Sequence, residues 1–193
     1  ALADVLRDTA GLPLLFVLGL PLTHGGKLYN CAAVCQNGRV LGVVPKTHLP
    51  NYNEFYEKRQ FTPAPAENGV IDLSGAQVPF GTNLLFQCGT QPALTLAVEI
   101  CEDLWAPLPP STRHAMAGAT LICNLSASDE TIGKAEYRRA LVTGQSARLL
   151  CGYVYADAGE GESTTDMVFA GHNMVAENGA LLAETAPFCG GMA

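Results

Sequence analysis

The sequence has few charged residues, no basic stretch and no long apolar run. Only 15% of its 193 residues are charged, and the formal net charge is -7. Nucleic-acid-binding proteins usually present a basic patch, so the composition argues against a nucleic-acid partner. A membrane-spanning helix needs about 18 or more consecutive apolar residues, which no segment supplies. The apolar segment 12–22 follows a start that carries Asp4, Arg7 and Asp8, not a basic region, so we expect neither a membrane span nor a signal peptide.

Glycine motifs that bind nucleotide phosphates are missing as well, since the sequence contains neither GxGxxG nor a Walker A loop. Its seven cysteines include no CxxC pair. Cys31 and Cys35 have no nearby histidine pattern of the kind that zinc needs, so we predict no metal site. Most of the cysteines lie in apolar, strand-like runs, where a thiol behaves as a small hydrophobic group. This usage of cysteine is typical of a reducing, cytosolic compartment.

Apolar residues, in contrast, are abundant. They make up 48% of the chain, and the mean hydropathy is +0.17, so the sequence is more apolar than an average soluble chain. Such a composition indicates extensive buried sheet, or a face that something outside this chain normally covers. A length of 193 residues suits one domain with a substantial core, or part of a larger domain.

Apolar runs and turn signals alternate along the chain, which predicts strands and hairpins. Asn37-Gly38 and Asn178-Gly179 each separate two apolar runs, the strongest short-range signal for a hairpin. The polar, proline-bearing segment 47–69 is predicted to be a long loop, and long loops in compact domains are often functional. Further strands are predicted at 14–22, where the strand should be buried, and at 70–75, 82–89, 93–100, 120–128 and 151–157.

Three segments have the pattern of helices. The start of the chain is predicted to be helical up to Gly11. A short helix is predicted at 109–119, with Ser111 or Thr112 as its cap. The longest helix is predicted from about Thr131 to Leu150, with an apolar stripe at helical spacing formed by Tyr137, Ala140, Leu141, Gly144 and Ala147. Because strands and helices interleave while hairpins are present, we expect an α/β sandwich with mixed sheets.

Residues whose side chains could take part in catalysis occur at three places in the sequence. Cys101 directly follows the apolar run 93–100, and Lys46 directly follows another apolar run. Glu54 and Glu57 lie in the long loop. A lysine near a thiol favours the thiolate and can stabilise an oxyanion, and a carboxylate can carry the proton to a leaving amine. Each residue also has a plain structural explanation: a packed thiol, a solvated lysine and loop charges.

These residues lie in stretches that resemble the nitrilase, or carbon-nitrogen hydrolase, superfamily. The lysine pattern is Pro45-Lys46-Thr47-His48-Leu49, the nucleophile pattern is Ile100-Cys101-Glu102-Asp103, and a second glutamate lies in Glu57-Lys58-Arg59-Gln60-Phe61. More narrowly, the stretches KTHLPNYNEFYEKRQF, VEICEDLW, ICNLSAS and ENGALLAE look like the glutaminase domain of glutamine-dependent NAD synthetases. The resemblance covers most of residues 14–187.

The resemblance implies a four-layer α-β-β-α sandwich, incomplete here, with a Glu-Lys-Cys triad. It carries over Cys101 as the nucleophile, Lys46 as its cationic partner, and Glu57 as the residue that orients Lys46. In the family the triad glutamate lies in a Pro-Glu pattern, which does not occur in this sequence. We therefore expect residues 1–193 to be a carbon-nitrogen hydrolase domain fragment, truncated at the N-terminus, that hydrolyses glutamine very poorly by itself.

The resemblance also implies a glutamine pocket with Tyr52, Glu102, Trp105 and Ser128. Alternatives are loop packing for Tyr52, the core for Trp105 and a helix cap for Ser128. In the implied reaction Cys101 attacks the glutamine side-chain carboxamide, while Lys46 and the backbone N–H of Glu102 stabilise the oxyanion. A thioester forms, ammonia leaves for a synthetase domain, and water releases glutamate.

The cofactors and partners follow from the same resemblance. The Ser-Gly-Gly-x-Asp-Ser type pyrophosphate loop of the synthetase domain does not occur in this sequence. ATP and magnesium are therefore expected only in that absent domain, and the glutaminase step is expected to need no cofactor. The resemblance further implies a cytoplasmic homo-oligomer.

The sequence is also compatible with three other functions. One is a stand-alone amidase or N-carbamoyl hydrolase of the same superfamily. Another is a cysteine hydrolase that uses His48 or His172 as its base, although both lie beside strands and the family's chemistry needs no histidine, so we expect both to be structural. The third is a non-catalytic binding module in which Cys101 is inert.

Overall fold

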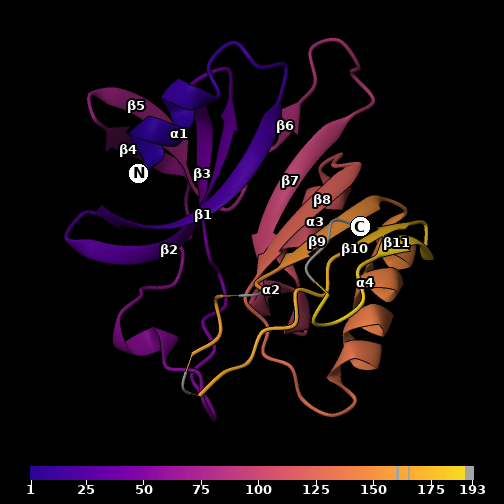
Figure 1. The fold of residues 1–193 in the computed structure, drawn as a ribbon. Coiled ribbons are helices and arrows are strands. Elements are labelled where there is room, and N and C mark those ends of the chain that lie inside the picture. Colours follow the sequence, from indigo (N-terminus) through magenta and orange to yellow (C-terminus); the bar gives the residue numbers. More distant parts are fainter. Residues whose placement is uncertain (160, 165, 190–193) are drawn as a thin grey trace. The chain divides into compact units, whose positions relative to one another are not determined.

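The chain folds into two compact units, each with its own sheet and its own apolar core. A computed structural model describes residues 1–159, 161–164 and 166–189 (Figure 1). The first unit comprises Ala1–Leu49 and Tyr56–Leu84, and the second comprises Pro50–Phe55 and Leu85–Ala193. Both sheets combine parallel and antiparallel neighbours, which confirms the prediction of mixed α/β structure.

The first unit is built on a five-stranded sheet in the order β1-β2-β3-β5-β4. Neighbouring strands are antiparallel except for β3 and β5. The predicted hairpin is present, because Asn37 and Gly38 turn the chain between β2 and β3 with φ of 48° and 72°. The elements of this unit are α1 (Leu2–Asp8), β1 (Leu15–His24), β2 (Lys27–Gln36), β3 (Arg39–Pro45), the 3-10 helix η1 (Glu57–Arg59), β4 (Gly69–Leu73) and β5 (Ala76–Phe80).

The core of the first unit consists mainly of side chains from β2, β3, β4 and β5. Leu2 and Leu6 of α1 pack against it, which confirms the predicted helix at the start of the chain. The prediction that segment 14–22 is a buried strand is half wrong. It forms β1, but all residues of β1 are exposed or partly exposed, because this strand lies at the sheet edge beside β2.

The second unit contains a six-stranded sheet in the order β11-β10-β9-β8-β7-β6. The strands β7, β8 and β9 run parallel, and α4 packs against β9 and β10 (Figure 1). The predicted hairpin at Asn178-Gly179 joins β10 to β11, with φ of 49° and 86°. The elements are β6 (Phe86–Gln87), β7 (Thr95–Ile100), α2 (Glu102–Trp105), α3 (Pro110–Met116), β8 (Leu121–Ser126), α4 (Lys134–Leu149), β9 (Gly152–Asp157), β10 (Met174–Glu177) and β11 (Ala180–Glu184).

The long helix α4 begins later than predicted and buries a different face. It begins at Lys134, because Gly133 before it has a φ of 82° and interrupts the helical conformation. Its buried positions are Arg138, Val142, Gln145 and Ser146. The predicted apolar stripe is largely exposed at Tyr137, Ala140, Gly144 and Ala147. Apolar spacing does not predict the buried face, because Arg138 and Gln145 are buried and form hydrogen bonds there, to Glu130 and Ser111 respectively.

Two shorter predictions are also corrected. The strand expected at 82–89 forms a strand only over Phe86–Gln87. The sequence patterns did not predict β5, because Gln77 and Pro79 interrupt its apolar residues. Helix α3 has Pro109 at its N-cap, so neither predicted residue caps it. Ser111 instead is buried, and its backbone N–H donates to Glu99 Oε2 at 2.8 Å.

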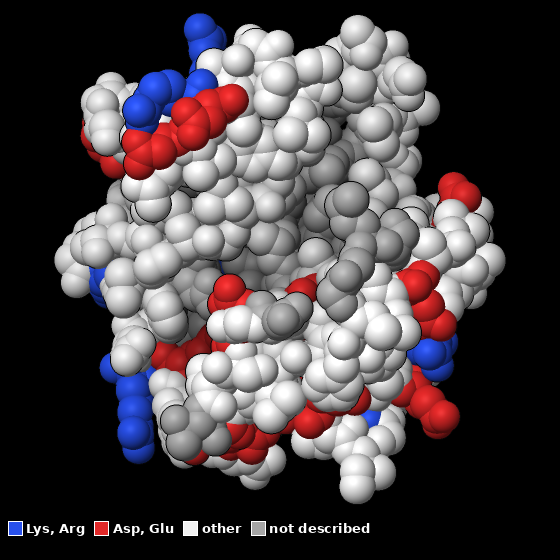
Figure 2. Space-filling model, in the orientation of Figure 1, with Lys and Arg blue, Asp and Glu red and all other residues white. Residues whose placement is uncertain are grey.

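The face shown in Figure 2 is mostly uncharged, and its charged side chains form small groups of both signs. This agrees with the 15% of charged residues in the sequence. Among the described helices, none combines the length and the apolar character that crossing a bilayer demands.

Candidate active site

Cys101 occupies a sharp turn between β7 and the short helix α2. Its backbone has φ of 47° and ψ of -102°, a conformation that residues other than glycine rarely adopt. Asn124 Oδ1 accepts the N–H of Cys101 at 3.1 Å, and Asp103 Oδ2 accepts the N–H of Ile100 at 3.0 Å. These bonds hold the turn at the carboxyl ends of the parallel strands, the edge where open α/β sheets bind ligands.

A pocket of about 450 Å³ opens beside this turn. All residues that line it belong to the second unit. The five predicted residues of this unit, namely Tyr52, Cys101, Glu102, Trp105 and Ser128, all line it. The pocket has the size of a small-molecule site. Its remaining lining residues are Asn53, Glu54, Phe55, Asp129, Thr131, Ile132, Gly133, Lys134 and Tyr137.

Tyr52 and Glu102 form a hydrogen-bonded pair on the pocket wall. The Tyr52 hydroxyl lies 3.0 Å from both carboxylate oxygens of Glu102, to which it donates. Burial, and then the hydrogen bond to Glu102, raise the pKa of the Tyr52 hydroxyl. Tyr52 therefore stays a protonated donor at neutral pH, and the Glu102 carboxylate is held in a defined orientation.

Lys134 and Asp129 bring opposite charges to the same pocket. The Lys134 ammonium forms an ion pair with Asp129 Oδ1. It also lies 5.4 Å from the ring centroid of Trp105 and 5.9 Å from that of Phe55, positions at which aromatic faces attract a cation. With one ammonium and the two carboxylates of Asp129 and Glu102, the pocket offers charges of both signs, which suits a zwitterionic amino acid.

Trp105 and Ser128 both line this pocket. The Trp105 ring is tilted against Tyr137 with centroids 5.4 Å apart, and it also packs on the core of this unit. That these two residues contact glutamine stays a prediction. The helix-cap alternative for Ser128 is wrong because α4 begins only at Lys134. The backbone N–H of Ser128 donates instead to Asp157 Oδ1 at 2.9 Å.

Lys46 and Glu57 form a pair within the first unit. Lys46 Nζ lies 2.8 Å from both carboxylate oxygens of Glu57, and only 1% of the lysine side chain is exposed. The backbone of Lys46 donates to the carbonyl of Asn30 at 2.8 Å and accepts from the N–H of Ala64 at 2.9 Å. The lysine is therefore held at both its backbone and its ammonium. That Lys46 acts together with Cys101 of the second unit stays a prediction.

The other cysteines have the character of packed apolar groups where they are buried. Burial raises the pKa of Cys31 to about 12 and that of Cys35, Cys123 and Cys151 to about 11. All seven cysteines lie in the described part of the chain, and none of them is in a disulfide. Within the same described residues no cluster of His, Cys, Asp and Glu has the arrangement of a metal site.

The sequence motifs missed two charged residues that line the pocket, Asp129 and Lys134. They also missed Asn124, which bonds the Cys101 backbone. A signal was present, because the polar run 128–131 closely follows β8, a strand parallel to the one that ends at Ile100. Parallel strands place their carboxyl ends at one edge of the sheet. His172 is buried and bonded to Arg138 and Glu184, which agrees with its expected structural role.

Comparison with known proteins finds that the chain is similar to glutamine-dependent NAD(+) synthetases. The chain is 54% identical over 188 residues to the glutamine-dependent NAD(+) synthetase of Mycobacterium bovis, which covers 97% of this chain but 28% of that protein. It is 49% identical over 185 residues to the protein of the same description from Mycobacterium leprae, covering 96% of this chain and 27% of that protein. The chain thus spans less than a third of the length of these relatives. No protein-family model matches it.

Solved structures agree with the sequence relatives. A glutamine-dependent NAD(+) synthetase from Cytophaga hutchinsonii superposes with a TM-score of 0.82 at 32% identity, over 95% of this chain and 29% of that one. A carbon-nitrogen hydrolase from Helicobacter pylori, at 19% identity and a TM-score of 0.73 over 96% of this chain and 63% of that one, shares the fold. The chain therefore belongs to the nitrilase-like domains of the glutamine-dependent NAD(+) synthetases.

Proposed function

We propose that this chain, as part of the complete gene product, hydrolyses the side-chain amide of glutamine and so supplies ammonia for NAD synthesis from deamido-NAD. The observation that carries the proposal is the pocket in which Cys101 lies with Tyr52, Glu102 and Ser128. Support comes from relatives whose names describe them as glutamine-dependent. The charges of Lys134 and Asp129 suit the α-carboxylate and α-ammonium groups of a free amino acid.

In the proposed reaction the Cys101 thiolate attacks the carboxamide carbon of glutamine, and the carbonyl oxygen becomes an oxyanion. Lys46 and the N–H of Glu102 stabilise this oxyanion. The C–N bond then breaks, the nitrogen leaves as ammonia with the proton that the thiol gave up, and a thioester remains. Water adds to the thioester, releases glutamate and restores the thiol. Glu57 orients Lys46 through their ion pair.

The proton needs a carboxylate near the thiol, which the Pro-Glu pattern supplies in the family. Glu54, Glu102 and Asp129 line the pocket with Cys101. Glu102 is bonded to Tyr52 and Asp129 to Lys134, so Glu54 is the first carboxylate of this chain to test as a substitute. We propose that the glutaminase step needs no cofactor, and that ATP and magnesium serve only a synthetase domain that receives the ammonia.

We further propose a cytoplasmic setting and a homo-oligomer. Seven cysteines without a disulfide are in keeping with a reducing compartment. The homo-oligomer is carried over from the family resemblance alone.

The proposal is tested by replacing Cys101 in the complete gene product. We expect Cys101→Ala to reduce ammonia release from glutamine by about 10³-fold or more, since the covalent route is lost, while NAD synthesis with added ammonium salts continues. Cys189→Ser is the matched control, because its thiol is exposed and does not line this pocket. Unchanged glutamine hydrolysis by Cys101→Ala, or hydrolysis of simple amides in preference to glutamine, would refute the proposal.

A further inference from the structure

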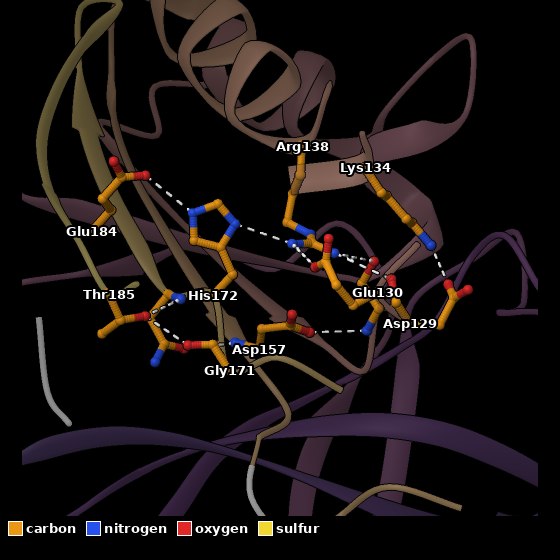
Figure 3. A network of polar contacts seen from close by, with 11 residues as sticks. Asp129, Glu130, Lys134, Arg138, Asp157, Gly171, His172, Glu184 and Thr185 are labelled. Atoms are coloured by element: carbon orange, nitrogen blue, oxygen red, sulfur yellow. Dashed lines mark hydrogen bonds and ion pairs between the residues drawn. The ribbon is translucent and has the colours of Figure 1, made fainter. Parts of the chain in front are cut away.

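The segment that joins β8 to α4 has the pocket on one side and a buried arginine on the other. Ser128 and Asp129 line the pocket, and Arg138 is 0% exposed. Figure 3 shows the Arg138 side chain reaching from α4 toward Glu130 and Asp129, with His172 on its other flank. The arginine lies behind the pocket wall and is not among the residues that line the pocket.

Arg138 bonds three consecutive residues of this segment. Its Nη1 donates to Glu130 Oε2 at 2.9 Å, and its Nη2 donates to the carbonyl of Asp129 at 3.2 Å and to Ser128 Oγ at 3.4 Å. A guanidinium has several donors in one rigid plane, so it can hold three acceptors in a fixed relation. An ammonium on a flexible chain cannot reproduce that geometry.

Asp129 is held from two sides by the same helix. Lys134 pairs with its carboxylate in the pocket, and Arg138, one turn further along α4, bonds its carbonyl from the buried side. The neighbouring backbone is also tied, since the N–H of Ser128 donates to Asp157 and the N–H of Glu130 donates to the carbonyl of Val168 at 2.7 Å.

His172 holds Arg138 in turn, and the direction of each bond follows from the chemistry. Arg138 Nη1 lies 3.0 Å from His172 Nδ1. Because arginine can only donate, Nδ1 must accept, and the proton of the neutral ring is on Nε2. His172 Nε2 therefore donates to Glu184 Oε2 at 3.0 Å, and Arg139 Nε donates to the same oxygen at 2.9 Å.

We propose that Arg138 is a positioning residue that holds the substrate-binding face of Ser128 and Asp129 in place, supported from behind by His172 and Glu184. The proposal rests on the proposed function, in which this pocket binds glutamine. According to this proposal Arg138 does not contact the substrate. It affects substrate binding through the positions of Ser128, Asp129 and the ion pair of Asp129 with Lys134.

The test compares Arg138→Lys and Arg138→Met with Arg148→Met in the complete gene product. Arg148 is another arginine of α4. It is exposed, and within the described structure it is not bonded to residues 128–130. We expect both Arg138 variants to raise the glutamine KM by roughly 10- to 100-fold, the factor that corresponds to losing one hydrogen bond to a charged group. The kcat should change little, because the Cys101 turn has other supports, and Arg138→Lys should retain more binding than Arg138→Met.

Amide hydrogen exchange provides a readout that does not depend on turnover. The N–H groups of Ser128 and Glu130 should exchange faster in Arg138→Lys than in Arg148→Met, while those of the buried strand β7 keep their protection. If the wild-type protein does not hydrolyse glutamine, the proposed function fails and the exchange comparison still decides the positioning role.

Several outcomes would overturn the proposal. One is a KM in the Arg138 variants equal to that of Arg148→Met. Another is a fall in kcat with unchanged KM, which would assign Arg138 to the chemical step. Equal exchange at Ser128 and Glu130 in the two kinds of variant also contradicts it, as does failure of both Arg138 variants to fold, since Arg138 would then be required for folding.

Discussion

The buried pair of Lys46 and Glu57 makes a prediction at the scale of single residues. Removing one partner of a buried ion pair leaves an uncompensated charge, whereas removing both can be nearly neutral. Glu57 is 22% exposed. We therefore expect Glu57→Gln to lower the free energy of unfolding by about 1–3 kcal/mol, less than the full range for a buried pair. Lys46→Met combined with Glu57→Gln should cost clearly less than the sum of the single variants.

Urea unfolding of the wild type, both single variants and the double variant measures this coupling. The glutaminase activity of all three variants should be low, because each removes or misplaces the lysine ammonium. Strictly additive changes in the free energy of unfolding would show that the two side chains are not coupled in the folded protein.

Asp157 makes a second prediction at this scale, through pH. Burial raises the pKa of its carboxyl to about 6, above the ordinary value near 3.9. The folded state therefore holds this proton more tightly than the unfolded state. Its contribution to stability is fully present below about pH 4 and is lost as pH rises through about 6. Asp157→Asn, which keeps an oxygen to accept the N–H of Ser128, should remove this dependence.

We expect the Tm of Asp157→Asn minus that of the wild type to increase between pH 4.5 and 7.5, by an amount equivalent to roughly 1–2 kcal/mol after allowance for partial exposure. Comparing the two proteins at each pH cancels the titration of all other groups. Scanning calorimetry at four pH values measures the difference. A difference that stays constant over this range contradicts the assignment to Asp157.

At the scale of elements, two hairpin turns offer a matched comparison. Gly179 joins β10 to β11 with φ of 86°, and Gly75 joins β4 to β5 with φ of 89°. A Cβ at Gly179 would lie 2.8 Å from the Cβ of Ala147 on α4, whereas one at Gly75 would meet no atom within 4 Å. Both alanine variants strain the backbone by about 1 kcal/mol, but only Gly179→Ala also pushes the hairpin from the helix.

Gly179→Ala should therefore lower the free energy of unfolding by about 1–3 kcal/mol more than Gly75→Ala does, in the range that overpacking costs. Adding Ala147→Gly should recover part of the difference. Equal destabilisation by the two single variants, measured by chemical denaturation, would mean that the hairpin is not pressed against α4.

At the scale of the whole molecule, the 193-residue chain is expected to hydrolyse glutamine poorly compared with the complete gene product. Its sequence contains Cys101 and Lys46 but not the Pro-Glu pattern of the triad glutamate. Loss of a general acid–base typically costs about 10²–10⁴-fold in rate. Ammonia release measured side by side tests the expectation. Comparable turnover would indicate that a carboxylate of this chain serves as the base, with Glu54 and Glu57 as the candidates. Glu54→Gln or Glu57→Gln would then lower the turnover by about 10²–10⁴-fold.

The sequence alone determined the features that depend on local pattern. The two Asn-Gly turns, the mixed α/β content and the apolar strand before Cys101 follow from residue types that favour one backbone conformation over short distances. Its motifs, through their resemblance to a known family, also singled out five residues of the second unit that line one pocket in the structure. Motifs succeed here because the pocket is built largely from short stretches beside strand ends.

Only the tertiary structure decided which face of α4 is buried and what that face does. Arg138 and Gln145 are polar, so their sequence predicts an exposed side, yet they are buried because partners far along the chain satisfy them, such as His172 and Ser111. The exposure of β1 likewise depends on its place at a sheet edge and not on its apolar composition. Long-range hydrogen bonds and strand order arise from contacts between distant segments. The periodicity of one segment carries no information about such contacts.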